Sequence, residues 1–71
     1  MDELIELVSD RVHANWMEAK QAAGVTTRKL ESGEELMVPY AELSEQAKEL
    51  DRGTVRTTIN ALRTLGYRVE R

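Results

Sequence analysis

Apolar residues recur at three- and four-residue spacing along the first third of the chain. The series runs through Leu4, Ile5, Val8, Val12, Trp16, Ala19 and Ala23. This is the spacing of one face of an α-helix. Asp2 and Glu3 lie in the first turn, where carboxylates suit the helix dipole, and Gly24 follows the last periodic residue as a stop signal. The pattern predicts one long amphipathic helix over residues 3–23.

The next segment favours irregular or extended backbone. Residues 25–28 are rich in β-branched side chains, residues 31–34 supply turn formers, and a short apolar run precedes Pro39. Such a pattern is typical of short strands around a turn. We therefore expect a loop with a small β-hairpin, or short strands, in residues 25–38.

Helical signals return after Pro39. Residues 40–43 fit a single helical turn, and Ser44 is placed to accept a backbone N–H as the N-cap of a short middle helix over residues 45–50. Gly53 then separates that helix from a C-terminal helix.

A second apolar stripe defines the C-terminal helix. It consists of Val55, Ile59, Leu62 and Leu65. The helix is predicted over residues 54–65 with Gly66 at its C-terminal cap, and it must pack on the first helix. Residues 67–69 alternate and favour one more short strand. The fold class expected is mostly α, of the α+β type.

Length limits how much of this pattern the chain can bury by itself. Its 71 residues form a single domain, 1–71, and a chain of this size buries only about 60% of its unfolded surface. The chain has no cysteine and one histidine, so neither a disulfide nor a metal site is expected to stabilise it. We expect a bound ligand or a partner subunit to supply the additional stability. No apolar run approaches the length of a membrane span, and we expect a soluble, cytoplasmic protein.

Charge is divided along the chain. Residues 31–51 hold seven acidic residues against one lysine, a net charge of −6, whereas residues 52–71 hold five arginines against one acid, a net charge of +4. The basic end favours an anionic ligand, an acidic partner or a second copy of the chain. A solvated helix face explains such runs equally well.

Catalytic signatures are missing from the sequence. It contains no glycine-rich phosphate loop, no Gly-x-Ser-x-Gly, no HExxH and no cysteine nucleophile, and we do not expect an enzyme or a resident cofactor. Trp16 and His13 form the most distinctive local group. Trp16 is either a core anchor or a partly exposed stacking platform, and His13 either contacts the ring edge or faces water.

Four residues of the last helix, Arg52, Arg56, Asn60 and Arg63, fall at steps that place them in a line opposite its apolar stripe. Such arginines can bind phosphate or carboxylate groups in bidentate fashion. Pairing with Glu45 or Glu49 is the competing interpretation. Duplex DNA is disfavoured by the pI of about 5.1.

Several short motifs, taken in order, resemble the RyR domain, the repeat found in ryanodine receptors. They are His13-x-Asn15-Trp16, Lys20, Gly24, Leu36-Met37-Val38-Pro39-Tyr40, Leu43, Asp51-Arg52-x-Thr54 and Leu65-Gly66-Tyr67-Arg68-Val69. The resemblance covers about residues 8–70. It departs from the family pattern at Val25, where tryptophan is frequent, and in the loop, which lacks the usual Tyr-Gly and His-Pro pieces.

The resemblance implies a non-catalytic ligand-binding module. Ryanodine receptors carry the domain as tandem pairs with approximate two-fold symmetry, so a single copy of the kind found in bacteria and phages implies a homodimer. It also implies an adenine-type nucleotide or nucleotide-derived signal, with Trp16 stacking on the base. The candidate ligand-binding residues are Trp16, His13, Arg11, Arg28, Tyr40, Arg52 and Arg56. The alternative is a protein-interaction module in which Trp16 and Tyr40 belong to the core.

Overall fold

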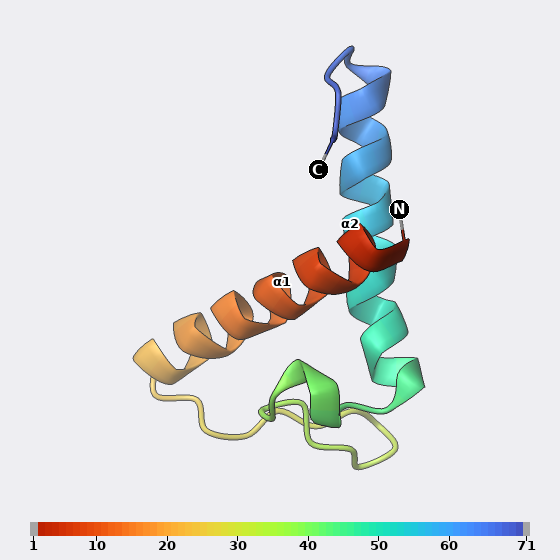
Figure 1. Cartoon of the computed structure of the whole chain (residues 1–71). Helices are drawn as coiled ribbons and strands as arrows, with labels where there is room; N and C mark the ends of the chain where they lie inside the picture. Colours follow the sequence, from red (N-terminus) through yellow and green to blue (C-terminus); the bar gives the residue numbers. More distant parts are fainter. Residues whose placement is uncertain (1, 71) are drawn as a thin grey trace.

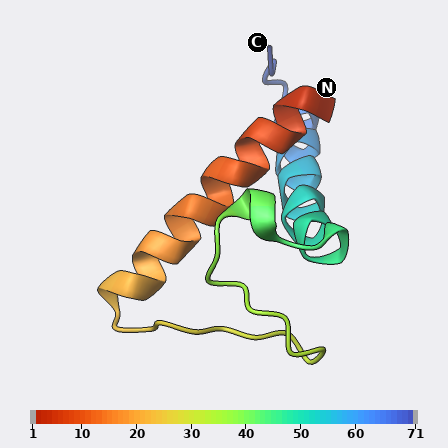
Figure 2. The same ribbon diagram turned by 60° about the horizontal axis from the view of Figure 1, so that its bottom comes forward.

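The computed structural model describes residues 2–70, which form two long helices joined by a mostly irregular segment (Figure 1). Helix α1 spans Asp2–Ala22, the short 3-10 helix η1 spans Tyr40–Glu42, and helix α2 spans Glu45–Thr64. The N-terminal part of α1 crosses α2, and the two helices diverge from there. In both views η1 lies in the angle between them (Figures 1 and 2).

Both predicted helix stops are confirmed, and the same motif forms each of them. At the end of α1 the Gly24 N–H donates to the Gln21 carbonyl and the Val25 N–H to the Lys20 carbonyl, both at 2.9 Å. Gly24 has a φ of 82°, which only glycine adopts without strain. Gly66, with a φ of 94°, ends α2 in the same way. The predicted first helix is therefore correct within a residue at each end.

The predicted break at Gly53 is wrong, because α2 is one continuous helix of 20 residues. A glycine inside a helix costs only about 1 kcal/mol relative to alanine, which packing and ion pairs on the flanking residues offset. The start of this helix follows the sequence prediction: the Ser44 Oγ accepts the Ala47 N–H at 3.1 Å. The separate middle and C-terminal helices are thus a single element.

The predicted hairpin and tail strand do not form. Within residues 2–70 the only β-type pairing is an isolated antiparallel bridge between Lys29 and Glu35. The Glu35 carboxylate accepts the backbone N–H groups of Arg28, at 2.7 Å, and Met37, at 3.1 Å. Side-chain oxygens therefore satisfy N–H groups that a strand ladder would otherwise use.

Two groups of buried apolar side chains stabilise the fold. The helix-crossing cluster contains Ile5, Val55 and Ile59, with Leu4, Val8 and Val69 packed against it. The loop-side cluster contains Tyr40, Leu43 and Ala47, with Leu30, Leu36 and Val38 packed against it. As predicted, the C-terminal part of the chain packs on α1.

The two apolar stripes are only partly covered. Val12 is 38% exposed, Leu62 39% and Leu65 73%, whereas the buried positions of α1 are Ile5, Ser9 and His13. The two helices diverge from their crossing (Figure 1), so the stripes meet around Ile5, Val55 and Ile59 and are less covered beyond that point. A wide apolar surface therefore lies open between the helices.

Candidate functional site

His13 lies at the junction of three parts of the chain. Its ring is buried, with 4% of the residue exposed. Its Nε2 lies 2.8 Å from the Val38 carbonyl oxygen and its Nδ1 lies 3.5 Å from Asp51 Oδ2. Because a carbonyl only accepts, Nε2 carries a proton. Burial raises the pKa of Asp51, and the neighbouring His13 opposes that rise. The imidazole thereby ties α1 to the loop and to α2.

Two aromatic rings flank His13. The Trp16 ring is stacked on it, with centroids 5.5 Å apart, and the Tyr40 ring is tilted against it at 6.3 Å. Trp16 is half-buried and Tyr40 is buried. The fold therefore brings together three of the predicted site residues, and Trp16 is neither a full core anchor nor a free platform.

Tyr40 also links η1 to α1 through its hydroxyl, which donates to Glu6 Oε2 at 3.0 Å. Burial, followed by this hydrogen bond to Glu6, raises the pKa of Tyr40. On the α2 side, the Lys48 ammonium lies 5.6 Å from the centre of the Tyr40 ring. That distance is within the range of a cation–π contact.

Carboxylates occupy Arg52 and Arg56 of α2. The Arg52 guanidinium contacts Glu6, and its Nη1 lies 2.9 Å from Glu45 and 3.3 Å from Glu49. Arg56 Nη1 lies 2.6 Å from Glu49. The hydrogen bonds from Arg52 lower the pKa of Glu6 and Glu45, and those from Arg56 and Arg52 lower the pKa of Glu49. The predicted alternative, in which Glu45 and Glu49 pair with these arginines, is confirmed.

None of the four candidate arginines lines the cavity that Trp16 borders. Arg11 and Arg28 are exposed, and within residues 2–70 neither guanidinium forms an ion pair. Trp16 lines a small cavity of about 130 Å³ together with Val12, His13, Leu36, Leu43, Ala47, Leu50 and Asp51. No lysine or arginine lines this cavity, so the described chain alone does not place a phosphate partner beside the tryptophan.

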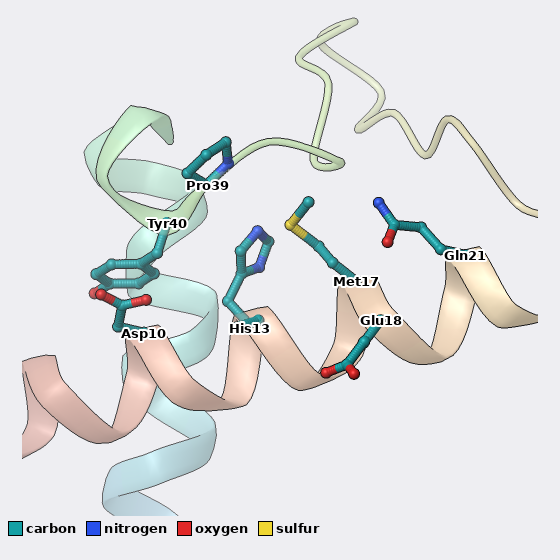
Figure 3. A pocket seen from close by; sticks show the side chains of 8 residues that line it. Asp10, His13, Met17, Glu18, Gln21, Pro39 and Tyr40 are labelled. Atoms are coloured by element: carbon teal, nitrogen blue, oxygen red, sulfur yellow. The ribbon is translucent and has the colours of Figure 1, made fainter.

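A second cavity, here the Tyr40 cavity, has a volume of about 290 Å³ and lies between α1 and the turn at Pro39 (Figure 3). Its lining consists of Asp10, His13, Ala14, Met17, Glu18, Gln21, Pro39 and Tyr40. Figure 3 shows His13, Met17 and Gln21 pointing from α1 toward the segment that carries Pro39. Two of its lining residues, His13 and Tyr40, were sequence candidates, and the others were missed because only the fold brings the turn to α1.

The third hollow, here the apolar trough, is the open surface between α1 and α2 and measures about 260 Å³. Its lining consists of Leu4, Val8, Val12, Thr54, Val55, Thr58, Ile59, Leu62 and Val69. None of these residues is charged. The sequence predicted the two apolar stripes that form the trough, but it predicted that their residues would be buried in the core and not exposed at the surface.

Other classes of site are not apparent in the part of the chain that the structure describes. No three His, Cys, Asp or Glu residues among residues 2–70 gather as metal ligands. Neither helix in that range combines the length and apolarity needed to cross a bilayer.

Compared with known protein families, the chain matches the RyR domain over residues 1–71, its whole length. Among curated protein sequences none matches it significantly.

Proposed function

The chain belongs to the RyR domain family, and from this premise we propose that it is a non-catalytic binding module whose working unit is a homodimer closed over the apolar trough. The observation that carries the proposal is the uncovered stripe of α1 and α2. Val12 and Leu62 line the trough and remain 38% and 39% exposed. Exposed contiguous apolar surface of this kind marks interaction sites in soluble domains.

The chemistry of the trough favours a second copy as the occupant. A two-fold contact places identical surfaces against each other, and the uncharged lining means that no like charges meet. Leu65 and Tyr67, which are 73% and 65% exposed, continue the apolar surface past the end of α2 and supply side chains that can enter the hollow of the other copy. Groove and protruding residues thus belong to the same surface.

A stable contact of this kind has to extend beyond the trough itself. A standard interface covers about 800 Å² per partner, which is roughly 15% of the chain's accessible surface of 5300 Å². The trough runs along residues 4–12 of α1 and residues 54–62 of α2, and Leu65 and Tyr67 are exposed beyond it. Coverage by a second copy also supplies the extra burial that a domain of this size needs.

Light scattering coupled to size-exclusion chromatography tests this proposal. We expect a dimer at micromolar concentration, and a monomer for both Val12→Glu and Leu62→Glu, because each places a carboxylate in the contact. Leu7→Glu is the matched control: Leu7 is 47% exposed on α1 and does not line the trough, so this variant should remain dimeric. A monomeric wild-type chain would contradict the proposal.

Nucleotide binding is the second candidate, and the half-exposed Trp16 ring is the observation that favours it. Since Arg52 and Arg56 are occupied by glutamates, the phosphates would be met by Arg11 or Arg28 of the second copy. The site would then be incomplete in a monomer. Thermal-shift measurements with adenine and guanine nucleotides should show stabilisation of the wild type, about 2.7 kcal/mol at 100 times Kd. That stabilisation should be absent in Leu62→Glu; no shift with any nucleotide eliminates this candidate.

A further inference from the structure

The apolar trough continues at one end into the smaller cavity that Trp16 borders, here the Trp16 cavity, because Val12 lines both hollows. At the other end lies Leu62, the trough residue of α2 farthest along the helix from that cavity. The Tyr67 backbone N–H donates to the Leu62 carbonyl at 2.9 Å, and Tyr67 is 65% exposed. A single groove therefore has a hollow beyond one end and an exposed aromatic side chain beyond the other.

We propose that the Tyr67 ring of each copy inserts into the Trp16 cavity of the other copy, so that each cavity is complete only in the dimer. This inference rests on the proposed homodimer and adds the side chain that each copy contributes. A two-fold axis across the middle of the trough exchanges its two ends. Trp16 is four residues beyond Val12 and Tyr67 is five residues beyond Leu62, each about one helical turn past the trough. The axis therefore brings the ring of one copy to the cavity of the other.

The size and lining of the Trp16 cavity suit a single tyrosine side chain. Its volume of about 130 Å³ is below the range of about 300 to 1,000 Å³ that is usual for small-molecule pockets. Most of its lining is apolar, and Leu50, which belongs to that lining, is 57% exposed. Asp51 supplies a carboxylate whose Oδ2 lies 3.5 Å from His13 Nδ1, and a carboxylate has further acceptor sites for a hydroxyl. Tyrosine combines the flat apolar ring and the donor that such a lining favours.

Charge complementarity favours the same arrangement of the two copies. The part of the lining that runs from Leu36 to Asp51 belongs to residues 31–51, whose net charge is −6, whereas Tyr67 belongs to residues 52–71, whose net charge is +4. Within one chain Arg52 and Arg56 are paired with two glutamates of the acidic segment, which leaves −4 and +2 and reverses neither sign. Inserting Tyr67 into the partner's cavity places the basic end of one copy beside the acidic segment of the other. A contact of tail against tail would bring like charges together.

The experiment is an isotope-filtered NOE measurement on dimers of one ¹³C-labelled and one unlabelled full-length chain, which detects only contacts between copies. The chain has one tryptophan and two tyrosines, so its aromatic signals can be assigned individually. We expect NOEs between the Tyr67 ring protons of one copy and the Leu36 and Leu50 methyl groups of the other. A dimer without these NOEs overturns the insertion of Tyr67 and leaves the homodimer standing, whereas a monomeric chain overturns both.

Variants measure what the ring contributes to association. Tyr67→Ala should raise the dimer Kd about 100-fold in sedimentation equilibrium, because two inserted rings are lost at about tenfold each. Tyr67→Phe retains the rings and loses only their hydrogen bonds, so its Kd should rise about tenfold. Leu7→Ala is the matched control, since Leu7 is 47% exposed and lines neither the trough nor the Trp16 cavity; its Kd should equal that of the wild type. Equal Kd values for Tyr67→Ala and Leu7→Ala would overturn the proposal.

Discussion

The two clusters of buried apolar side chains differ in what closes them. Around the loop-side cluster, polar groups fix an irregular segment: Glu34 binds the Ser44 N–H at 2.9 Å and its hydroxyl at 2.6 Å, and His13 holds the Val38 carbonyl. The helix-crossing cluster has the Glu6–Arg52 ion pair near it, but it opens directly into the apolar trough. The loop-side cluster is therefore closed by groups of the same chain, whereas the helix-crossing cluster leaves apolar surface of α1 and α2 exposed, where a partner can cover it.

The largest effect is expected where the loop-side cluster meets its polar closure. Tyr40→Ala should lower the free energy of unfolding by about 3 to 5 kcal/mol, because a buried aromatic side chain is lost. Tyr40→Phe keeps the ring and removes only the bond to Glu6, so its cost should be about 1 kcal/mol. Urea denaturation followed by circular dichroism measures both. Equal costs would mean that the hydroxyl, and not the ring, holds η1 in place.

The helix-crossing cluster can be probed on both sides of its opening. Ile59→Ala should cost about 2 to 4 kcal/mol at any protein concentration, because Ile59 is buried within the chain. Leu62→Ala should cost under about 1 kcal/mol in dilute solution and more as concentration rises, since its burial requires a second copy. Denaturation at two protein concentrations distinguishes them. Identical behaviour of the two variants would remove the contrast between core and trough.

Acid should loosen the loop before the helices. The Arg28 backbone N–H, then the Thr27 hydroxyl and the Met37 N–H, lower the pKa of Glu35 from 4.5 to about 2. A depressed pKa means that this carboxylate stabilises the fold above about pH 4.5 and loses that contribution as pH falls toward 2. Melting temperature measured across this range should fall less steeply in Glu35→Gln than in the wild type. Glu31→Gln, the control, should follow the wild-type curve.

The smallest expected effect is an increase in the stability of the fold. Gly53→Ala should stabilise the chain by about 0.5 to 1 kcal/mol, because Gly53 is inside α2 and an added Cβ meets no atom within 4 Å. Gly66→Ala should destabilise it, since that residue has a φ of 94°. Thermal melts of the two variants give the comparison. A loss of stability in Gly53→Ala would indicate that α2 needs to bend at this point.

The sequence predicted those features of the fold that depend on interactions between residues close together in the chain. Ser44, Gly24 and Gly66 mark helix ends through bonds to residues a few positions away, and these predictions are confirmed. Gly53 gave the same type of signal and was misleading, because packing on both sides of it outweighs a small local penalty.

Contacts between residues far apart in the chain could not be predicted from the sequence, because they depend on how the chain folds. Glu34 and Glu35 lie in or beside the predicted turn, yet Glu34 binds the Ser44 N–H and Glu35 binds the Arg28 N–H. The proximity of His13 and Trp16 follows from their spacing on a helix, but that of Tyr40 depends on the path of the loop. The sequence also could not show which side of the α1 stripe would remain uncovered.

The way Glu35 closes the loop limits how any other protein can recognise this chain. Extended segments usually attract partners by strand addition, which needs a row of free backbone N–H and C=O groups along an edge. Here the N–H groups of Arg28 and Met37 are already held by one carboxylate, and no strand is present in residues 2–70. These two N–H groups are therefore not available to pair with an added strand unless the Glu35 carboxylate releases them.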